Sequence, residues 1–229
     1  QNKKFILAAD IGSNPDKIYT KDYQAGALSF EIFSNDKKLI SNSGYYPDTK
    51  NRLNKLSKST ALQNTLSIED YSSSDFIKSS NNFLIQRDLK IENKNIVFEK
   101  NYWKISASHN GYFKKFKLDH HREIEFYPEQ FKFIGHDKIV RKDPDKQIKF
   151  DIRFHLHPNS KVMKTQNNKF ILIQLEDEGW QFSCDNYDIN IDNGLYFGNK
   201  NSYQENQNIF ISGMSNESEQ IIKWEISKI

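Results

Sequence analysis

The stretch IKFDIRFHLHP, from Ile148 to Pro158, decides the fold because its residues alternate strictly between apolar and polar. The apolar set is Ile148, Phe150, Ile152, Phe154 and Leu156. The polar set is Lys149, Asp151, Arg153, His155 and His157. A period of two predicts a β-strand with one buried face, on which each fully buried side chain contributes roughly 1.5–3 kcal/mol. We therefore expect a core strand that ends at Pro158.

The polar side of this strand allows two interpretations. Alternate residues of a strand lie about 7 Å apart, so the acid, the arginine and the two histidines form one ridge. The commoner arrangement is a solvated outer face, because outward faces of antiparallel sheets are normally polar. The alternative is a polar ridge that lines a cleft.

Short runs with the same period recur along the whole chain, separated by Gly, Pro, Asn and Asp. They predict strands at Phe5–Asp10, Ala27–Phe33, Lys38–Ser41, Gln63–Ile68, Phe83–Leu89, Ile96–Glu99, Trp103–Ala107, Ile124–Tyr127, Phe131–Val140, Ile148–His157, Val162–Thr165, Phe170–Leu175, Trp180–Cys184, Tyr187–Ile191, Leu195–Gly198, Gln207–Ser212 and Ile221–Ser227. Only Thr49–Ser59 suggests a helical turn. Many short strands at even spacing predict an all-β fold, a large antiparallel β-sandwich with little or no helix.

The organisation of the chain and its composition limit the classes of protein to which it can belong. The sequence shows no internal repeat and no low-complexity linker, so residues 1–229 are expected to form one domain. The alternative is that the loop region Ser41–Ser80 forms a flexible flap. The abrupt start at Gln1 suggests a fragment or a processed product. A net charge of +3, from 33 bases and 30 acids, argues against a nucleic-acid partner. One cysteine, Cys184, excludes an internal disulfide framework, and no apolar run approaches the roughly 18–20 residues of a membrane span.

Several segments together resemble the C-terminal β-domain of the heparinase II/III-like family. They are YQAGALSFEIF (23–33), KLISNSGYYPD (38–48), STALQNTLSIEDYSSSDF (59–76), SASHNGYFKKF (106–116), IRFHLHP (152–158), GWQF (179–182), IFISG (209–213) and KWEI (223–226). The resemblance implies a bacterial polysaccharide lyase whose N-terminal helical toroid, absent from this chain, completes the active site. It also implies β-elimination of acidic, uronic-acid-containing glycans such as glycosaminoglycans, in the periplasm or cell envelope.

The resemblance also implies a role for individual residues. Where the family has two histidines, this sequence has Gln24 and Gln63, followed by Asn64. One such histidine helps to hold zinc in metal-binding members, and an amide is a poor substitute, so no metal or other cofactor is expected. Glutamine can still donate a hydrogen bond to a sugar, so Gln24, Gln63 and Asn64 are candidate substrate-binding residues.

Two further matches provide the remaining candidates. His109 and Tyr112 lie in the SHNGY segment, where they either meet a substrate as catalytic groups or pack as a turn cap and a core ring. His155 and His157 match HLHP and are expected to bind substrate or to bond neighbouring strands. Arg52 and Lys58 each offer a cation that suits a carboxylate or a sulfate. For Lys58, an ordinary exposed surface lysine is the simpler interpretation.

Other polar residues are expected to be structural. His120-His121-Arg122 form a charged run typical of a solvated face, and His136 is expected to be a satisfied histidine inside a strand. Three functions remain open. The chain is the β-domain of an active lyase, a carbohydrate-binding or scaffold module that has lost catalysis, or a structural sandwich that docks a partner domain.

Overall fold

The alternating stretch forms strand β11, Ile148–His155, in the interior of a four-stranded sheet. It pairs antiparallel with β16 (Gln204–Ser215) on one side and with β4 (Leu66–Ile68) on the other. Its apolar side chains, and Leu156 just beyond it, are buried. The predicted core strand is confirmed. The computed structural model describes residues 4–79, 82–85, 89–166, 168–198 and 202–229.

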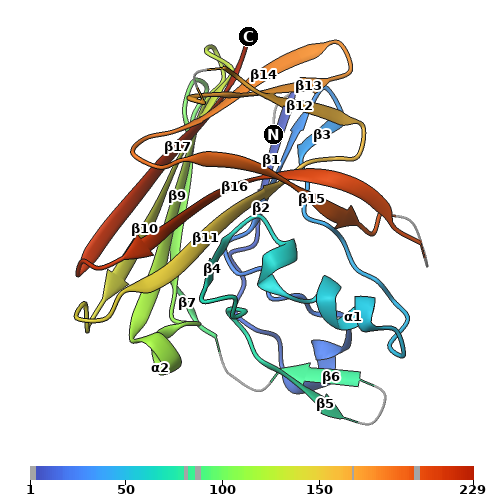
Figure 1. The fold of residues 1–229 in the computed structure, drawn as a ribbon, viewed down its shortest axis with the longest axis vertical. Coiled ribbons are helices and arrows are strands. Elements are labelled where there is room, and N and C mark those ends of the chain that lie inside the picture. The colour runs from blue at the N-terminus through green and yellow to red at the C-terminus, as the bar shows by residue number, and fades with distance from the viewer. Residues whose placement is uncertain (1–3, 80–81, 86–88, 167, 199–201) are drawn as a thin grey trace.

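An eight-stranded antiparallel sheet forms one layer of the sandwich (Figure 1). Its order is β12-β13-β14-β17-β10-β9-β8-β7. The strands are β7 (Ile91–Phe98), β8 (Trp103–His109), β9 (Leu118–Tyr127), β10 (Lys132–Arg141), β12 (Ser160–Lys164), β13 (Ile171–Leu175), β14 (Glu178–Cys184) and β17 (Glu219–Lys228).

The second layer combines two smaller antiparallel sheets. One has the order β15-β16-β11-β4, and the other has the order β1-β2-β3. Their remaining strands are β1 (Phe5–Ala9), β2 (Phe30–Ser34), β3 (Lys37–Ile40) and β15 (Ile189–Tyr196). An antiparallel bridge between Ile40 and Leu156 joins the two sheets. A separate hairpin consists of β5 (Phe76–Ser79) and β6 (Asn82–Ile85), so the predicted all-β sandwich is confirmed.

Helix is limited to short segments in the described residues. They are α1 (Arg52–Ser57), α2 (Phe113–Phe116) and two 3-10 helices, η1 (Lys17–Asp22) and η2 (Thr60–Leu62). The helical turn predicted within Thr49–Ser59 is confirmed as α1. None of the described helices is long or apolar enough to cross a lipid bilayer.

Aromatic rings fill the space between the layers. Phe30 of β2 stacks on Trp224 of β17, with ring centroids 5.3 Å apart and planes within 6°. Phe154 of β11 meets the same indole edge-on at 4.9 Å. Gly135 lies opposite Trp224 in the β10–β17 register, and a Cβ on Gly135 would lie 2.0 Å from the indole. The indole therefore requires glycine at position 135.

Several strand predictions differ from the structure; the predicted strands Tyr187–Ile191 and Leu195–Gly198, for example, form the single strand β15 (Ile189–Tyr196). The expected Ala27–Phe33 strand begins only at Phe30, because Leu28 has a φ of 60° and turns the chain. The expected Ile124–Tyr127 strand begins at Leu118. The expected Phe83–Leu89 strand is seen as β6, which ends at Ile85, and residues 86–88 lie outside the described residues.

Candidate functional site

Gln24 and Gln63 meet although they are far apart in the sequence. Gln24 follows η1, and Gln63 follows η2. Both side-chain amides donate to the carbonyl oxygen of Ser57, the last residue of α1, at 2.9 Å from Gln24 and 3.4 Å from Gln63. Gln24 Nε2 also donates to the carbonyl of Gly44 at 2.7 Å. The two amides thus join α1 to the chain before β2 and to the loop after β3.

The Gln24–Gln63 junction does not fit the zinc implied by the resemblance. Both amide nitrogens face carbonyl oxygens, and zinc prefers imidazole or thiolate donors. In the described part of the chain, no three His, Cys, Asp or Glu side chains cluster as metal ligands. We therefore derive no chemistry through a metal.

His155 lies beneath the segment that connects β3 to β4. Its Nε2 lies 3.0 Å from the carbonyl oxygen of Ala61, so this nitrogen carries the proton and donates. Its Nδ1 then accepts from the Ser43 hydroxyl at 3.2 Å. Burial lowers the pKa of His155 to about 4, which keeps the ring neutral. The solvated-face interpretation of the ridge is wrong at this residue, because the β3–β4 segment covers it.

Asn64 is a buried junction between three parts of the chain. Its Oδ1 accepts from the His155 backbone N–H at 2.6 Å, and its Nδ2 donates to the Phe30 carbonyl at 2.8 Å. Its own backbone N–H donates to Asn42 Oδ1 at 2.7 Å. The side chain has no exposed surface. Asn64 therefore orders the region, and a contact with substrate stays a prediction.

The cationic and imidazole candidates differ in accessibility. Arg52 begins α1 and is exposed, so it can reach a ligand. Lys58 is buried, donates to the Lys21 carbonyl, and lies over the Tyr45 ring; burial lowers its pKa, so the surface interpretation of Lys58 is wrong. His157 is half-buried against Tyr196, with ring centroids 5.2 Å apart.

His109 and Tyr112 lie in the core. Tyr112 donates from its hydroxyl to the Leu66 carbonyl at 2.7 Å. His109 Nδ1 accepts from the Gly111 N–H at 3.1 Å. Both residues are at most 2% exposed, which matches the turn-cap and core-ring alternative. Catalysis by either residue would require its side chain to leave the core.

The His109 ring begins a buried chain of polar groups that sequence analysis missed. Since its Nδ1 accepts, its Nε2 donates to His120 Nδ1 at 3.1 Å, and His120 Nε2 then donates to Asp137 Oδ1 at 2.6 Å. Arg122 donates to both oxygens of Asp137, at 2.7 and 2.9 Å. Burial lowers the pKa of both histidines, whereas the Arg122 guanidinium and the His120 hydrogen bond hold the pKa of Asp137 well below its usual range.

Arg122 links this buried chain to the Gln24–Gln63 region. Its Nη1 donates to the carbonyls of Leu28 and Asn64, at 2.9 and 2.5 Å. The expectation that His120 and Arg122 form a solvated face is wrong, because both residues are at most 4% exposed. The alternation would have shown this if β9 had been extended: His120 and Arg122 share the phase of the buried Ile124 and Phe126.

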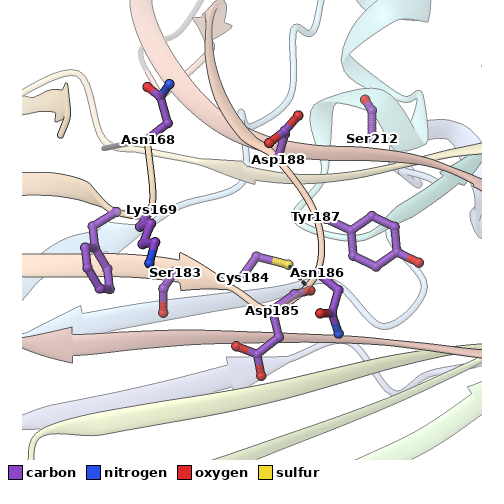
Figure 2. Close-up of a pocket in the computed structure, with 10 residues that line it drawn as sticks. Asn168, Lys169, Ser183, Cys184, Asp185, Asn186, Tyr187, Asp188 and Ser212 are labelled. Atoms are coloured by element: carbon purple, nitrogen blue, oxygen red, sulfur yellow. Dashed lines mark hydrogen bonds between the residues drawn. The ribbon is translucent and has the colours of Figure 1, made fainter. Parts of the chain in front are cut away.

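A wide depression of about 880 Å³ lies elsewhere, at the ends of β13 and β14. It is lined by Asn168, Lys169, Phe170, Ser183, Cys184, Asp185, Asn186, Tyr187, Asp188 and Ser212. Figure 2 shows these side chains diverging: Asp185 and Asn186 point to one side of the chain, and Asp188 points to the other. Burial raises the pKa of the Cys184 thiol to about 12, so the thiol stays protonated. This depression offers no convergent set of groups.

Comparisons with known proteins agree with the fold. The chain is 24% identical over 237 residues to FtsZ-localized protein C from Caulobacter vibrioides (strain NA1000 / CB15N), a match that covers 97% of this chain and 40% of that protein. The heparan sulfate lyase HepC from Pedobacter heparinus superposes with a TM-score of 0.73 at 13% identity, over 90% of this chain and 30% of the lyase. A heparinase III structure superposes with a TM-score of 0.74 at 14% identity, over 98% of this chain and 33% of that protein.

The chain thus spans 40% or less of the length of each of these proteins. The likeness to the two lyases, at 13% and 14% identity, concerns the fold. The family assignment rests on a sequence model, described as heparinase II/III-like, C-terminal, that matches residues 1–225. The chain belongs to the heparinase II/III-like C-terminal domain family.

Proposed function

We propose that this chain is the C-terminal β-domain of a heparinase II/III-like polysaccharide lyase and forms one wall of the cleft that holds an acidic glycan. The family match over residues 1–225 carries the proposal. The chain corresponds to about a third of each lyase that it resembles, 30% of HepC and 33% of heparinase III, so the rest of the catalytic machinery belongs to other parts of the protein. The periplasm or cell envelope is the proposed location.

Gln24 and Arg52 are the groups that meet the glycan. Gln24 Nε2 donates to two carbonyls, which orients the amide and leaves its Oε1 as the acceptor. No partner of Oε1 is recorded among the described residues, and the side chain is half-buried. We assign Oε1 to a sugar hydroxyl and the exposed Arg52 guanidinium to a uronate carboxylate or a sulfate. Both groups bind and orient the glycan, and neither transfers a proton.

A second function is a carbohydrate-binding or scaffold module without catalysis. Two points favour it: Gln24 and Gln63 stand where the family resemblance implies histidines, and His109 and Tyr112 have partners in the core. The curated relative is named for its localisation to FtsZ and not for a lyase reaction.

One experiment separates these functions. The full-length protein, including whatever precedes Gln1, is incubated with several uronic-acid glycans, and unsaturated uronate is followed in the ultraviolet. Product that is reduced in Arg52→Ala and Gln24→Ala, and unchanged in the exposed control Lys161→Ala, supports the lyase. Glycan binding without product supports the binding module. If neither glycan binding nor product is detected, both functions are contradicted. The third alternative, a structural sandwich that docks a partner domain, then remains.

A further inference from the structure

The outer face of the eight-stranded sheet carries a second polar site. In the strand register, His121 lies opposite Lys138, and Glu123 lies opposite His136. These four side chains alternate with inward residues such as Arg122 and therefore point away from the second layer. Together with Asn93, Ser106 and Ile221 they line a depression of about 410 Å³. The Gln24–Gln63 junction belongs to the other side of this sheet.

The charges around the depression are already paired. Glu123 forms an ion pair with Lys104, and Lys138 lies 2.9 Å from Glu219. Lys223, opposite His136, lies 3.7 Å from Asp185. The paired carboxylates therefore do not repel an incoming anion as free ones would.

The two imidazoles, by contrast, have no recorded partner. Among the described residues, neither His121 nor His136 makes a hydrogen bond or an ion pair. Both are half-buried and line the depression, so their ring nitrogens offer unused donor and acceptor capacity there. The interpretation of His136 as a satisfied structural histidine is therefore wrong. Two open imidazoles beside a lysine suit an oxyanion.

A β-bulge places an amide at the rim. The β7–β8 register shifts between Glu92 and Asn95, and Asn93 has a φ of 54°. Asn93 Nδ2 donates to Ser108 Oγ at 2.9 Å, which fixes the amide beside the depression. Bulges recur next to binding sites because they redirect a side chain.

We propose that this depression binds the carboxylate or sulfate group of an acidic sugar unit, through His121, His136 and Lys138. Its volume of about 410 Å³ falls in the range of small-molecule sites, roughly 300–1,000 Å³. Asn93 and Ser106 supply hydrogen bonds to ring hydroxyls, and Ile221 supplies an apolar wall. The site is separate from the proposed cleft and holds glycan on the opposite face of the sheet.

The test follows the imidazole resonances of the full-length protein by NMR. The probes are a uronate oligosaccharide, its sulfated counterpart and inorganic sulfate. We expect an oligosaccharide to shift the His121 and His136 resonances, also in the Gln24→Ala, Arg52→Ala cleft variant. His121→Asn and His136→Asn are expected to weaken this binding roughly tenfold, the effect of losing one charge-assisted hydrogen bond. The exposed Lys161→Ala on β12 is the control.

Four results would overturn the proposal. The first is that neither oligosaccharide moves the two resonances. The second is that both His variants bind the oligosaccharides as tightly as the unmodified protein. The third is that inorganic sulfate binds as tightly as the sugars, which makes the depression a site for a free oxyanion. Loss of the resonance shifts in the cleft variant alone would mean that the cleft, and not this face, binds the glycan.

Discussion

Asp137 accepts four hydrogen bonds in the core, from His120, from two nitrogens of Arg122 and from Trp224. These donors come from β9 and β17, the two strands that flank β10. Arg122 also donates to Leu28 and Asn64 in the second layer. The Asp137 carboxylate therefore neutralises and orients the Arg122 guanidinium, which connects the two layers. Loss of one partner leaves a buried, uncompensated charge, which costs about 3–5 kcal/mol.

We expect Asp137→Asn to lower the free energy of unfolding by about 3–5 kcal/mol, because the Arg122 guanidinium loses its counter-charge. Urea denaturation measures the change. The control is Asp177→Asn, which removes an exposed acid from an ion pair with Lys37 and should have a much smaller effect. Equal effects of the two substitutions would contradict the role of Asp137.

Acid should destabilise the protein before its carboxylates titrate. The pKa of His155 falls from 6.5 to about 4 on burial, so the unfolded chain binds the proton first. This residue's contribution is present above pH 6.5 and is lost as pH falls towards 4, by about 3 kcal/mol in total. His109 and His120 act in the same direction, and Asp137 adds to the loss below 3.8.

Unfolding in urea from pH 8 to pH 4 tests this expectation. The slope of stability against pH should become shallower in His155→Gln, which cannot titrate. His157→Gln, at a half-buried position, should retain most of the slope. Stability that does not change between pH 6.5 and pH 4 would show that the buried imidazoles are not neutral.

At the scale of elements, the alternation of apolar and polar residues predicts only the second half of β9. The sequence predicted Ile124–Tyr127, whereas the strand runs from Leu118 to Tyr127. Histidine and arginine at inward positions concealed its first half, because their burial depends on Asp137, which lies on the next strand. The contacts of Gln24 with Gly44 and Ser57 depend equally on long-range packing and could not be predicted from local pattern.

The amide junction should control the order of the β3–β4 segment. Gln24→Ala removes the hydrogen bond to the Gly44 carbonyl and one of the two hydrogen bonds to the Ser57 carbonyl, which costs about 1–3 kcal/mol. We expect faster amide hydrogen exchange over residues 41–64 and unchanged exchange in β10 and β17. Gln174→Ala removes a single exposed hydrogen bond and serves as the control. Uniform acceleration across all strands would instead indicate a global loss of stability.

A metal should have no part in that junction. We expect zinc or a chelator to leave the melting temperature of the protein unchanged, because amide nitrogens facing carbonyls offer no zinc ligands. Differential scanning fluorimetry with and without each additive measures this. A rise in melting temperature with zinc that Gln24→Ala abolishes would contradict the assignment.

At the scale of the molecule, period-two alternation was sufficient for the two-layer sandwich. The core strand β11 and the antiparallel strands packed around it follow from local patterning. The candidate site does not, since its parts come from segments before β2, after β3, in α1 and after η2. Resemblance identified Gln24 and Gln63 as residues to examine, whereas only the fold shows that they meet at Ser57.

The most direct test of the glycan-cleft assignment is hydrogen exchange of the full-length protein with and without an acidic oligosaccharide. We expect protection of residues 41–64 around α1, and its loss in the Gln24→Ala, Arg52→Ala variant but not in Lys161→Ala. Protection confined to other regions, or unchanged in the double variant, would contradict the assignment of this face of the domain to a glycan cleft.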